Sequence, residues 1–206
     1  IGLVEVLGQR APEPRELILI NGVLRIVRNH LALLDYGERD TLTGLLNRKT
    51  YDEAFYKVMA ATMPPAGDQS SDRRADARQQ HHFIGVIDID HFKRVNDTHG
   101  HLIGDEVLLL LSRLMRSSFR FYDKLYRFGG EEFVVLMRGG TVEQASTAFE
   151  RLRTNVEAYV FPRVGRITVS VGFTQLRPGD SPSSAFERAD KAVYHAKQNG
   201  RNQVAH

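Results

Sequence analysis

A sharp turn between two strand-like segments stands in the second half of this 206-residue sequence. Residues 127–133 read RFGGEEF, and residues 133–137, FVVLM, return at once to strand-forming residue types. Paired glycines between such segments predict a β-hairpin, because glycine adopts the backbone angles of a tight hairpin turn without strain. A turn that only reverses the chain does not need two neighbouring like charges, so Glu131 and Glu132 are candidates for chemistry.

Strand and helix patterns alternate around this hairpin. Residues 83–89, FIGVIDI, form an apolar, β-branched run that is typical of a buried strand. The other expected elements are helices over 16–36, 39–61 (with start signals at Thr41 and Thr43), 101–119, 141–159 and 181–200, and a strand over 166–176. Strands separated by helices around an antiparallel hairpin predict an α/β sandwich of the ferredoxin-like kind with a mixed sheet.

The first expected helix carries a short heptad pattern. Its a and d positions are Leu17, Ile20, Leu24, Val27, Leu31 and Leu34. Either an amphipathic helix packed on its own domain or the end of a dimerising helix would explain the pattern, and the narrow apolar stripe favours the second. The sequence starts at Ile1 rather than Met. We therefore expect residues 1–37 to be a linker or signalling helix, continuing from an absent upstream sensor domain, and residues 38–206 to form the main domain.

Composition excludes several classes of function. Hydrophobic residues make up 42% and charged residues 26%, an ordinary globular balance, and the net charge of +3 does not call for a nucleic-acid partner. There is no cysteine, and therefore no disulfide, thiolate nucleophile or cysteine metal site. No apolar run has the length of a membrane span, and no signal peptide is visible. Residues 64–82 are polar and turn-rich, which predicts an exposed insertion without a function of its own.

Acidic residues gather where strands are expected to end. Asp88 lies near the end of the buried strand, and Glu131 and Glu132 follow the hairpin turn. In one mixed sheet these carboxylates can converge, and a cation between them would relieve their repulsion. Mg²⁺ prefers a few carboxylates together with substrate phosphates, which points to a nucleoside triphosphate. The alternative, in which all these acids face solvent, remains open on spacing alone.

Basic residues that could hold phosphates also occur. Lys93 follows the buried strand, and Lys197 and Arg201 are four residues apart, so they would share a face if the last helix extends that far. Basic residues near a helix C-terminus are also common for purely local reasons. No Walker A phosphate loop is present.

Taken together, these segments resemble a known family. Residues 129–133, GGEEF, match a form of the signature of GGDEF domains, the diguanylate cyclases. The other motifs that resemble the family, in family order, are DTLTGLLNR at 40–48, DIDHFKRVNDTHGHLIGDEVL at 88–108 and ADKAVYHAKQNGRNQV at 189–204. The resemblance covers about residues 38–206. It implies an α+β, polymerase-palm-like core, a bacterial cytoplasmic enzyme, and condensation of two GTP into cyclic di-GMP and two pyrophosphates across a homodimer.

The resemblance also assigns roles to residues. The expected metal ligands are Asp88, Glu131 and the backbone carbonyl of Ile89. Glu132 would join them or activate the 3′-hydroxyl. A pair of Mg²⁺ ions is expected at each site, with Mn²⁺ as an alternative.

Substrate contacts follow from the same motifs. Asn96 and Asp105 would read guanine, since Asp105 can accept hydrogen bonds that adenine does not offer. The phosphates would be neutralised by Lys93, also assigned to catalysis, and by Lys197 and Arg201. The remaining expected substrate contacts are Phe92, Gly129 and Gly130, the glycines allowing close approach of the backbone.

A second site is expected just before the signature. Residues 120–123, RFYD, match the family's RxxD inhibitory motif, so Arg120 and Asp123 would bind the product, with Arg151 as a further contact. Three alternatives to an active cyclase are a non-catalytic cyclic di-GMP receptor, a cyclase making a mixed guanine–adenine product, and a plain dimerisation module. The intact GGEEF and basic residues argue against the first, and Asp105 argues against the second.

Overall fold

The computed structural model describes residues 13–62 and 81–206, and the chain divides into two compact units, residues 1–38 and 39–206. The first unit contains α1 (Pro14–Glu38), a single helix two residues longer at each end than the sequence predicts. Its apolar side chains are largely exposed, and Ile18 and Ile26 keep 73% and 69% of their accessible surface. The side chains of Leu31 and Leu34, and most of the predicted insertion at 64–82, lie outside the described residues.

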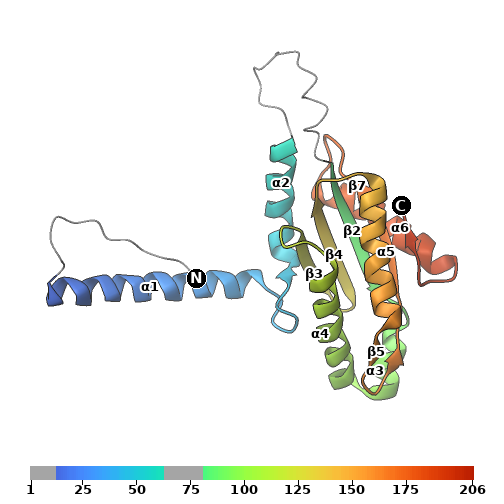
Figure 1. Cartoon of the computed structure of the whole chain (residues 1–206), viewed down its shortest axis with the longest axis horizontal. Helices are drawn as coiled ribbons and strands as arrows, with labels where there is room; N and C mark the ends of the chain where they lie inside the picture. The colour runs from blue at the N-terminus through green and yellow to red at the C-terminus, as the bar shows by residue number, and fades with distance from the viewer. Residues whose placement is uncertain (1–12, 63–80) are drawn as a thin grey trace, which may run out of the picture. The chain divides into compact units, whose positions relative to one another are not determined.

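The second unit is built on a mixed sheet of six strands in the order β1-β3-β4-β2-β7-β8 (Figure 1). Its strands are β1 (Leu46–Asn47), β2 (His82–Ile89), β3 (Lys124–Gly129), β4 (Glu132–Arg138), β7 (Val169–Gln175) and β8 (Val204–Ala205). The four long strands pair antiparallel, whereas β1 and β8 pair parallel with β3 and β7. A separate small hairpin joins β5 (Val160–Phe161) and β6 (Gly165–Arg166). The predicted α+β fold with a mixed central sheet is confirmed.

Helices cover both faces of this sheet (Figure 1). They are α2 (Tyr51–Thr62), α3 (Phe92–His99), α4 (His101–Ser118), α5 (Val142–Ala158) and α6 (Pro182–Gln198). Strand β2 runs through the centre, and its side chains alternate between two apolar clusters. Phe83 and Ile87 join the cluster with α4 and α5, whereas Ile84 and Val86 join the cluster with α2 and α6. The next residue on the α6 face is Asp88, so the buried strand delivers a carboxylate to the end of an apolar layer.

Local sequence signals explain where the last two helices begin. Thr141 and Ser181 each accept a hydrogen bond from the backbone three residues on, and a reciprocal side-chain bond completes a capping box at both. Pro182 occupies the first turn of α6, where its missing N–H costs nothing. Both helices were predicted, because these signals are readable without tertiary information.

The predicted helix over 39–61 starts too early. Asp40 Oδ1 accepts hydrogen bonds from Thr43 N at 2.8 Å and Thr43 Oγ1 at 2.7 Å, and Gly44 has φ +66°. This closed turn prevents a helix from starting at Thr41 or Thr43. The chain then runs as β1 and a short 3₁₀ turn, η1 (Arg48–Thr50), before α2 begins.

Candidate active site

Three carboxylates meet at the end of β2. Asp88 and Glu132 are direct partners in the antiparallel register of β2 and β4, so their side chains project from the same face of the sheet. Glu131 precedes β4 in the hairpin turn. Burial raises the pKa of all three carboxyls, and the charge of Asp88 raises the pKa of both glutamates further. The structure thus brings together the acids that the sequence predicted to converge.

Helix α6 supplies the compensating charge. Lys197 Nζ lies 2.8 Å from Asp88 Oδ1, and this ion pair is largely covered, with side-chain exposures of 31% for Lys197 and 10% for Asp88. Lys197 also lowers the pKa of Glu131 and Glu132, but less than burial and Asp88 raise it. The acidic cluster is therefore only partly neutralised by the protein.

Two further charged residues influence the cluster and were not predicted from the sequence. Asp190 raises the pKa of both Asp88 and Glu132, after the larger contribution of burial. Arg48 in η1 lowers the pKa of Glu132. Asp190 could have been found, because it precedes Lys197 by seven residues and so shares its face of α6. Arg48 had no such signal, since its position depends on the unpredicted turn before α2.

The donors suit a hard cation. Among the described residues, no three His, Cys, Asp or Glu side chains are arranged to hold a metal ion by themselves. The available ligands are oxygens, from Asp88, the two glutamates and the carbonyl of Ile89, which ends β2. Mg²⁺ usually takes one or two carboxylates and completes its shell with substrate phosphates and water. The raised pKa values and the partial compensation by Lys197 fit a site that a cation and a triphosphate would complete together.

A second aspartate, Asp90, has quite different surroundings. It is 5% exposed, and it accepts hydrogen bonds from Thr168 Oγ1 at 2.7 Å, Ser170 Oγ at 2.7 Å and Asn202 N at 3.1 Å. Both of its oxygens are engaged. Asp90 therefore ties the end of β2 to β7 and to the segment after α6.

The glycine turn is held by one arginine. Gly129 and Gly130 have φ values of +148° and +51°, which other residues rarely adopt. Arg127 donates from Nε and Nη2 to Gly130 O at 3.2 and 2.9 Å, and from Nη1 to both oxygens of Asp40 at 3.2 Å. Burial opposes the charge of Asp40, yet the bonds from Thr43 and Arg127 lower its pKa overall. This contact joins the DTLTGLLNR and GGEEF motifs, 87 positions apart.

The predicted guanine-reading residues lie at the corner between α3 and α4. A Cβ added to Gly104 would lie 1.9 Å from Asn96 Oδ1 and 3.3 Å from Phe92 Cζ. The Asn96 amide therefore rests against the backbone immediately before Asp105. Asn96 is half-buried and Asp105 exposed, so both are accessible from solvent. Phe92 is only 5% exposed and belongs to the core, which leaves its backbone as its means of contact with a ligand.

Lys197 and Arg201 would share a helical face only if the last helix reached Arg201, and it does not. Helix α6 ends at Gln198, and Gly200, Arg201 and Asn202 all have positive φ, at +108°, +63° and +45°. The glycine stop of the helix lies before Arg201, so Arg201 projects from a loop. Its side chain is exposed, as is that of Lys93 in the first turn of α3.

A polar network holds this loop against α5. Asn202 Nδ2 donates to Glu157 Oε1 at 2.8 Å, and Asn202 Oδ1 accepts from Arg153 Nη1 at 3.0 Å. Arg153 also pairs with Glu157 at 2.8 Å and with Glu150 at 2.7 Å. Together with the bond from Asn202 N to Asp90, these contacts stabilise three consecutive left-handed residues.

The predicted product-binding residues surround a separate cavity of about 170 Å³, lined by Arg120, Asp123 and Arg151 among others. Asp123 is 8% exposed and accepts hydrogen bonds from Arg120 N at 3.0 Å and Arg138 N at 3.1 Å. Arg120 Nη1 donates to Tyr122 Oη at 2.7 Å, and Arg151 donates to the carbonyl of Ser118. Asp123 thus shapes the turn, and Arg120 and Arg151 are the basic residues that line the cavity.

Comparison with known proteins shows to which family the chain belongs. Residues 38–203 match the family described as diguanylate cyclase, GGDEF domain. The chain belongs to the GGDEF domain family. Diguanylate cyclase DgcP of Pseudomonas aeruginosa is 39% identical over 168 residues, covering 80% of this chain and 23% of that protein. Diguanylate cyclase DgcM of Escherichia coli is 32% identical over 203 residues, covering 98% of this chain and 45% of that protein. The chain thus spans less than half the length of either relative.

Solved GGDEF structures share the fold. The coiled coil and GGDEF domain of DgcB from Caulobacter crescentus, in complex with c-di-GMP, is 30% identical with a TM-score of 0.76, and the match covers 94% of this chain and 99% of that one. The active GGEEF domain of a diguanylate cyclase from Vibrio cholerae is 32% identical with a TM-score of 0.66, covering 78% and 96% of the two chains. Within the described ranges, no helix has the length and apolar character needed to cross a membrane.

Proposed function

We propose that this GGDEF domain is a diguanylate cyclase that condenses two GTP into cyclic di-GMP and releases two pyrophosphates. The observation that carries the proposal is the pairing of Asp88 and Glu132 across β2 and β4, with Lys197 on Asp88 and Glu131 in the adjoining turn. Carboxylates and an ammonium group at one strand end suit a metal-bound triphosphate. The names of the relatives support the same activity.

The chemistry requires positioning and charge neutralisation rather than a covalent protein nucleophile. Each subunit would hold one GTP, and the 3′-hydroxyl of one GTP would attack the α-phosphate of the other, twice. Mg²⁺ held by Asp88, Glu131 and the Ile89 carbonyl would neutralise the developing charge. Lys197 and Arg201 would bind phosphate oxygens, together with Lys93.

Guanine would be selected at the corner between α3 and α4. Asp105 can accept from the ring N–H and the exocyclic amine of guanine, and Asn96 lies beside it against Gly104. Adenine does not present this pair of donors, so it would leave a carboxylate unpaired in the complex. A mixed guanine–adenine product is therefore not expected.

Turnover would need a homodimer, because each subunit supplies half of the reaction site. Residues 1–37 would act as a dimerising and signalling helix that links an upstream sensor domain to the cyclase domain at 38–206. Leu17 and Val27 of the heptad pattern are exposed on α1, which supports this. Leu24→Glu with Leu31→Glu should lower specific activity at limiting protein concentration. Unchanged activity through a dilution series would count against a role for the helix.

Product inhibition would act at the cavity between Arg120 and Arg151. Two guanidinium groups suit the phosphates or guanine of cyclic di-GMP. Arg120→Ala should relieve inhibition by added product while leaving the initial rate unchanged. If added product inhibits the variant as strongly as the parent, the cavity is not the inhibitory site.

The decisive experiment is chromatography of products after incubation with GTP and Mg²⁺ at several protein concentrations. Cyclic di-GMP should form at a rate that rises faster than linearly with protein. Absence of product at every concentration, with GTP bound, would mean that this chain lacks its activating assembly or is a cyclic di-GMP receptor. Labelled cyclic di-GMP that binds the parent protein but not the Arg120→Ala variant would identify a receptor that uses the cavity between Arg120 and Arg151.

A further inference from the structure

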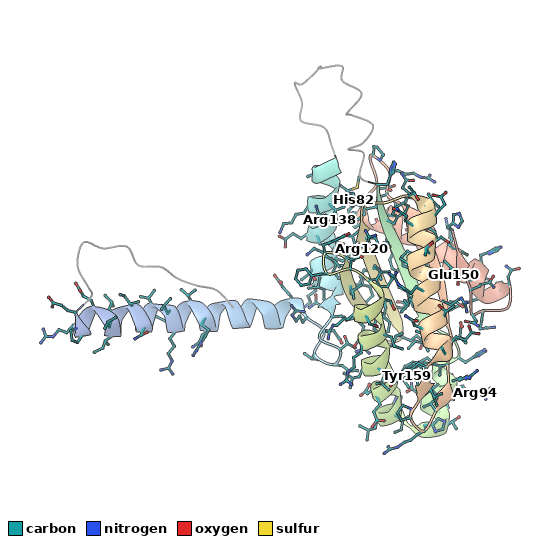
Figure 2. The ribbon with its side chains drawn as sticks, viewed as in Figure 1. His82, Arg94, Arg120, Arg138, Glu150 and Tyr159 are labelled. Carbon is teal, nitrogen blue, oxygen red and sulfur yellow. The ribbon has the colours of Figure 1, made fainter. Side chains whose placement is uncertain are left out.

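A second cavity, of about 260 Å³, lies against helix α3 on the face that the guanine-reading residues do not use. One face of the helix lines it, through the N-cap residue His91 and through Arg94, Val95 and Thr98 of α3. Asn96 and Lys93 fall on other faces of the same helix. Arg94 lies at the end of the unit near α3 and β5, far from Arg120 and the predicted product cavity (Figure 2). The two cavities share no lining residue.

The charge of this cavity is positive. Arg94 and Arg166 line it, both side chains are exposed, and neither forms an ion pair with any residue that the structure describes. His91 and His99 add hydrogen-bonding groups to the lining. Among the residues that line the cavity, Asp90 is the one carboxylate. Asp90 accepts from Thr168, Ser170 and Asn202.

Glu157 also interacts with Arg166. The hydrogen bonds from Arg153 and Asn202 to Glu157 lower the pKa of its carboxyl most, and Arg166 lowers that pKa less. Arg153 and Asn202 therefore leave Glu157 little capacity to neutralise Arg166. Two arginines that form no ion pair with a described residue, beside an opening of this size, form the kind of site that binds a phosphate-bearing anion. Val95, Val164 and Ile167 form an apolar part of the wall, so the cavity also accommodates an uncharged portion of a ligand.

The backbone at His91, beside the cavity, has an unusual conformation. His91 has φ +59°, a left-handed conformation that a residue with a side chain adopts at a cost. It precedes α3 without making a side-chain cap for that helix. The imidazole, which lines the cavity, is therefore not committed to the helix end and remains available for a ligand.

We infer that this cavity binds a pyrophosphoryl group, carried either by free pyrophosphate or by a nucleoside diphosphate, at a site separate from the proposed GTP position. Arg94 and Arg166 contact the anion, and His91 and His99 supply further hydrogen bonds. The inference goes beyond the proposed cyclase and does not depend on it. Since α3 carries Asn96 on another face, an anion in this cavity contacts the same helix that is proposed to read guanine.

Calorimetric titration of the full chain with inorganic pyrophosphate, without metal or GTP, tests this site. A Lys197→Ala, Arg201→Ala background removes the phosphate contacts proposed for the acidic cluster. In that background, Arg94→Ala with Arg166→Ala should weaken pyrophosphate binding about tenfold or more. Arg28→Ala with Arg113→Ala removes the same charge from exposed positions on α1 and α4 and should change the affinity by less than about twofold.

A second titration with ADP separates the two sources of the pyrophosphoryl group, because adenine lacks the donors that Asp105 would accept. Binding of ADP but not pyrophosphate, lost in the Arg94→Ala, Arg166→Ala variant, identifies a nucleotide as the source. Failure of both ligands to bind the background protein overturns the inference. Equal affinity in the two double variants also overturns it. Thermal unfolding of each variant verifies that the fold is intact, and cyclase activity has no part in any of these outcomes.

Discussion

Asp88 and Asp90 are two residues apart at the same end of β2, yet their surroundings differ in almost every respect. Asp90 accepts three hydrogen bonds from β7, the residue before β7 and the loop after α6. Asp88 faces Glu132 across the sheet and is compensated by the ammonium of Lys197. Asp90 therefore has hydrogen-bond donors on both of its oxygens, whereas Asp88 has one cationic partner and neighbouring carboxylates that repel it.

The difference separates structure from chemistry within a single motif. Burial of a carboxylate is tolerated when its oxygens are fully hydrogen-bonded, as at Asp90. It raises the pKa when they are not, as at Asp88. The DID segment therefore contains one residue that ties the end of β2 to its neighbours and one whose charge Lys197 compensates only in part.

Replacing Asp88 should produce the largest effect on activity. Asp88→Asn removes the carboxylate that faces Glu132 but keeps its size, so cyclic di-GMP formation should fall on the order of 10³-fold. Initial rates with GTP and Mg²⁺ measure this. The melting temperature of the metal-free variant should not fall. A variant that retains a tenth of the parent rate would remove Asp88 from the reaction site.

Asp90→Ala should instead act on stability. It leaves Thr168, Ser170 and the N–H of Asn202 without an acceptor, which should lower the free energy of unfolding by about 2–4 kcal/mol. Denaturant titration measures this, with Asp105→Ala as an exposed control that should change stability by less than about 0.5 kcal/mol. If Asp90→Ala is as stable as that control, the network at Asp90 is not structural.

Asn202→Ala should sharpen the comparison, because Asn202 links the Asp90 network to the loop of Arg201. Losing the side-chain bonds to Arg153 and Glu157 should cost about 1–2 kcal/mol of stability and raise the KM for GTP several-fold, with a smaller change in kcat. Asn155→Ala, which loses one hydrogen bond from α5 to Ser118 of α4, is the matched control. A change in stability with KM unaltered would mean that the loop does not position Arg201.

The smallest predicted effect concerns the electrostatic repulsion among Asp88, Glu131 and Glu132. The folded-state pKa values of Glu131 and Glu132 lie above the ordinary 4.5, so the folded protein binds these protons more tightly than the unfolded chain does. Stability of the metal-free protein should therefore fall as pH rises above about 4.5 through the raised values. Glu131→Gln with Glu132→Gln should flatten this dependence and raise stability at pH 7 by about 1 kcal/mol, since both groups are partly exposed. Melting curves from pH 4 to 8 test it, and a steeper dependence in the variant would contradict it.

Much of this arrangement could be predicted from local patterns. The buried strand, the glycine hairpin and the capped helices α5 and α6 are each specified by residues within a few positions of one another. The convergence of Asp88 with Glu131 and Glu132 followed from placing strand ends together in one sheet. Family resemblance then supplied the roles of these residues, which remain proposals here.

The rest depended on contacts distant in sequence. Thr41 and Thr43 looked like helix starts because the hydrogen bonds from Thr43 to Asp40 could not be foreseen. Helix α3 was missed because its eight residues are mostly polar and Gly100 separates it from α4. The position of Arg201 could not be predicted from helical spacing, because α6 ends before it and residues 200–202 all have positive φ. The bonds from Asn202 to Arg153 and Asp90 that stabilise this loop are distant in sequence.

The bond between Asn202 and Asp90 also has a consequence for how the protein is made. The two residues are 112 positions apart, so a chain still emerging from the ribosome forms β2 long before its partner exists. Until residue 202 has been made, Asp90 lacks one of its three donors, and the segment that carries Arg201 lacks this link to β2. A chain interrupted before this point would therefore lack the loop that presents Arg201, although β2 and its carboxylates would already have been made.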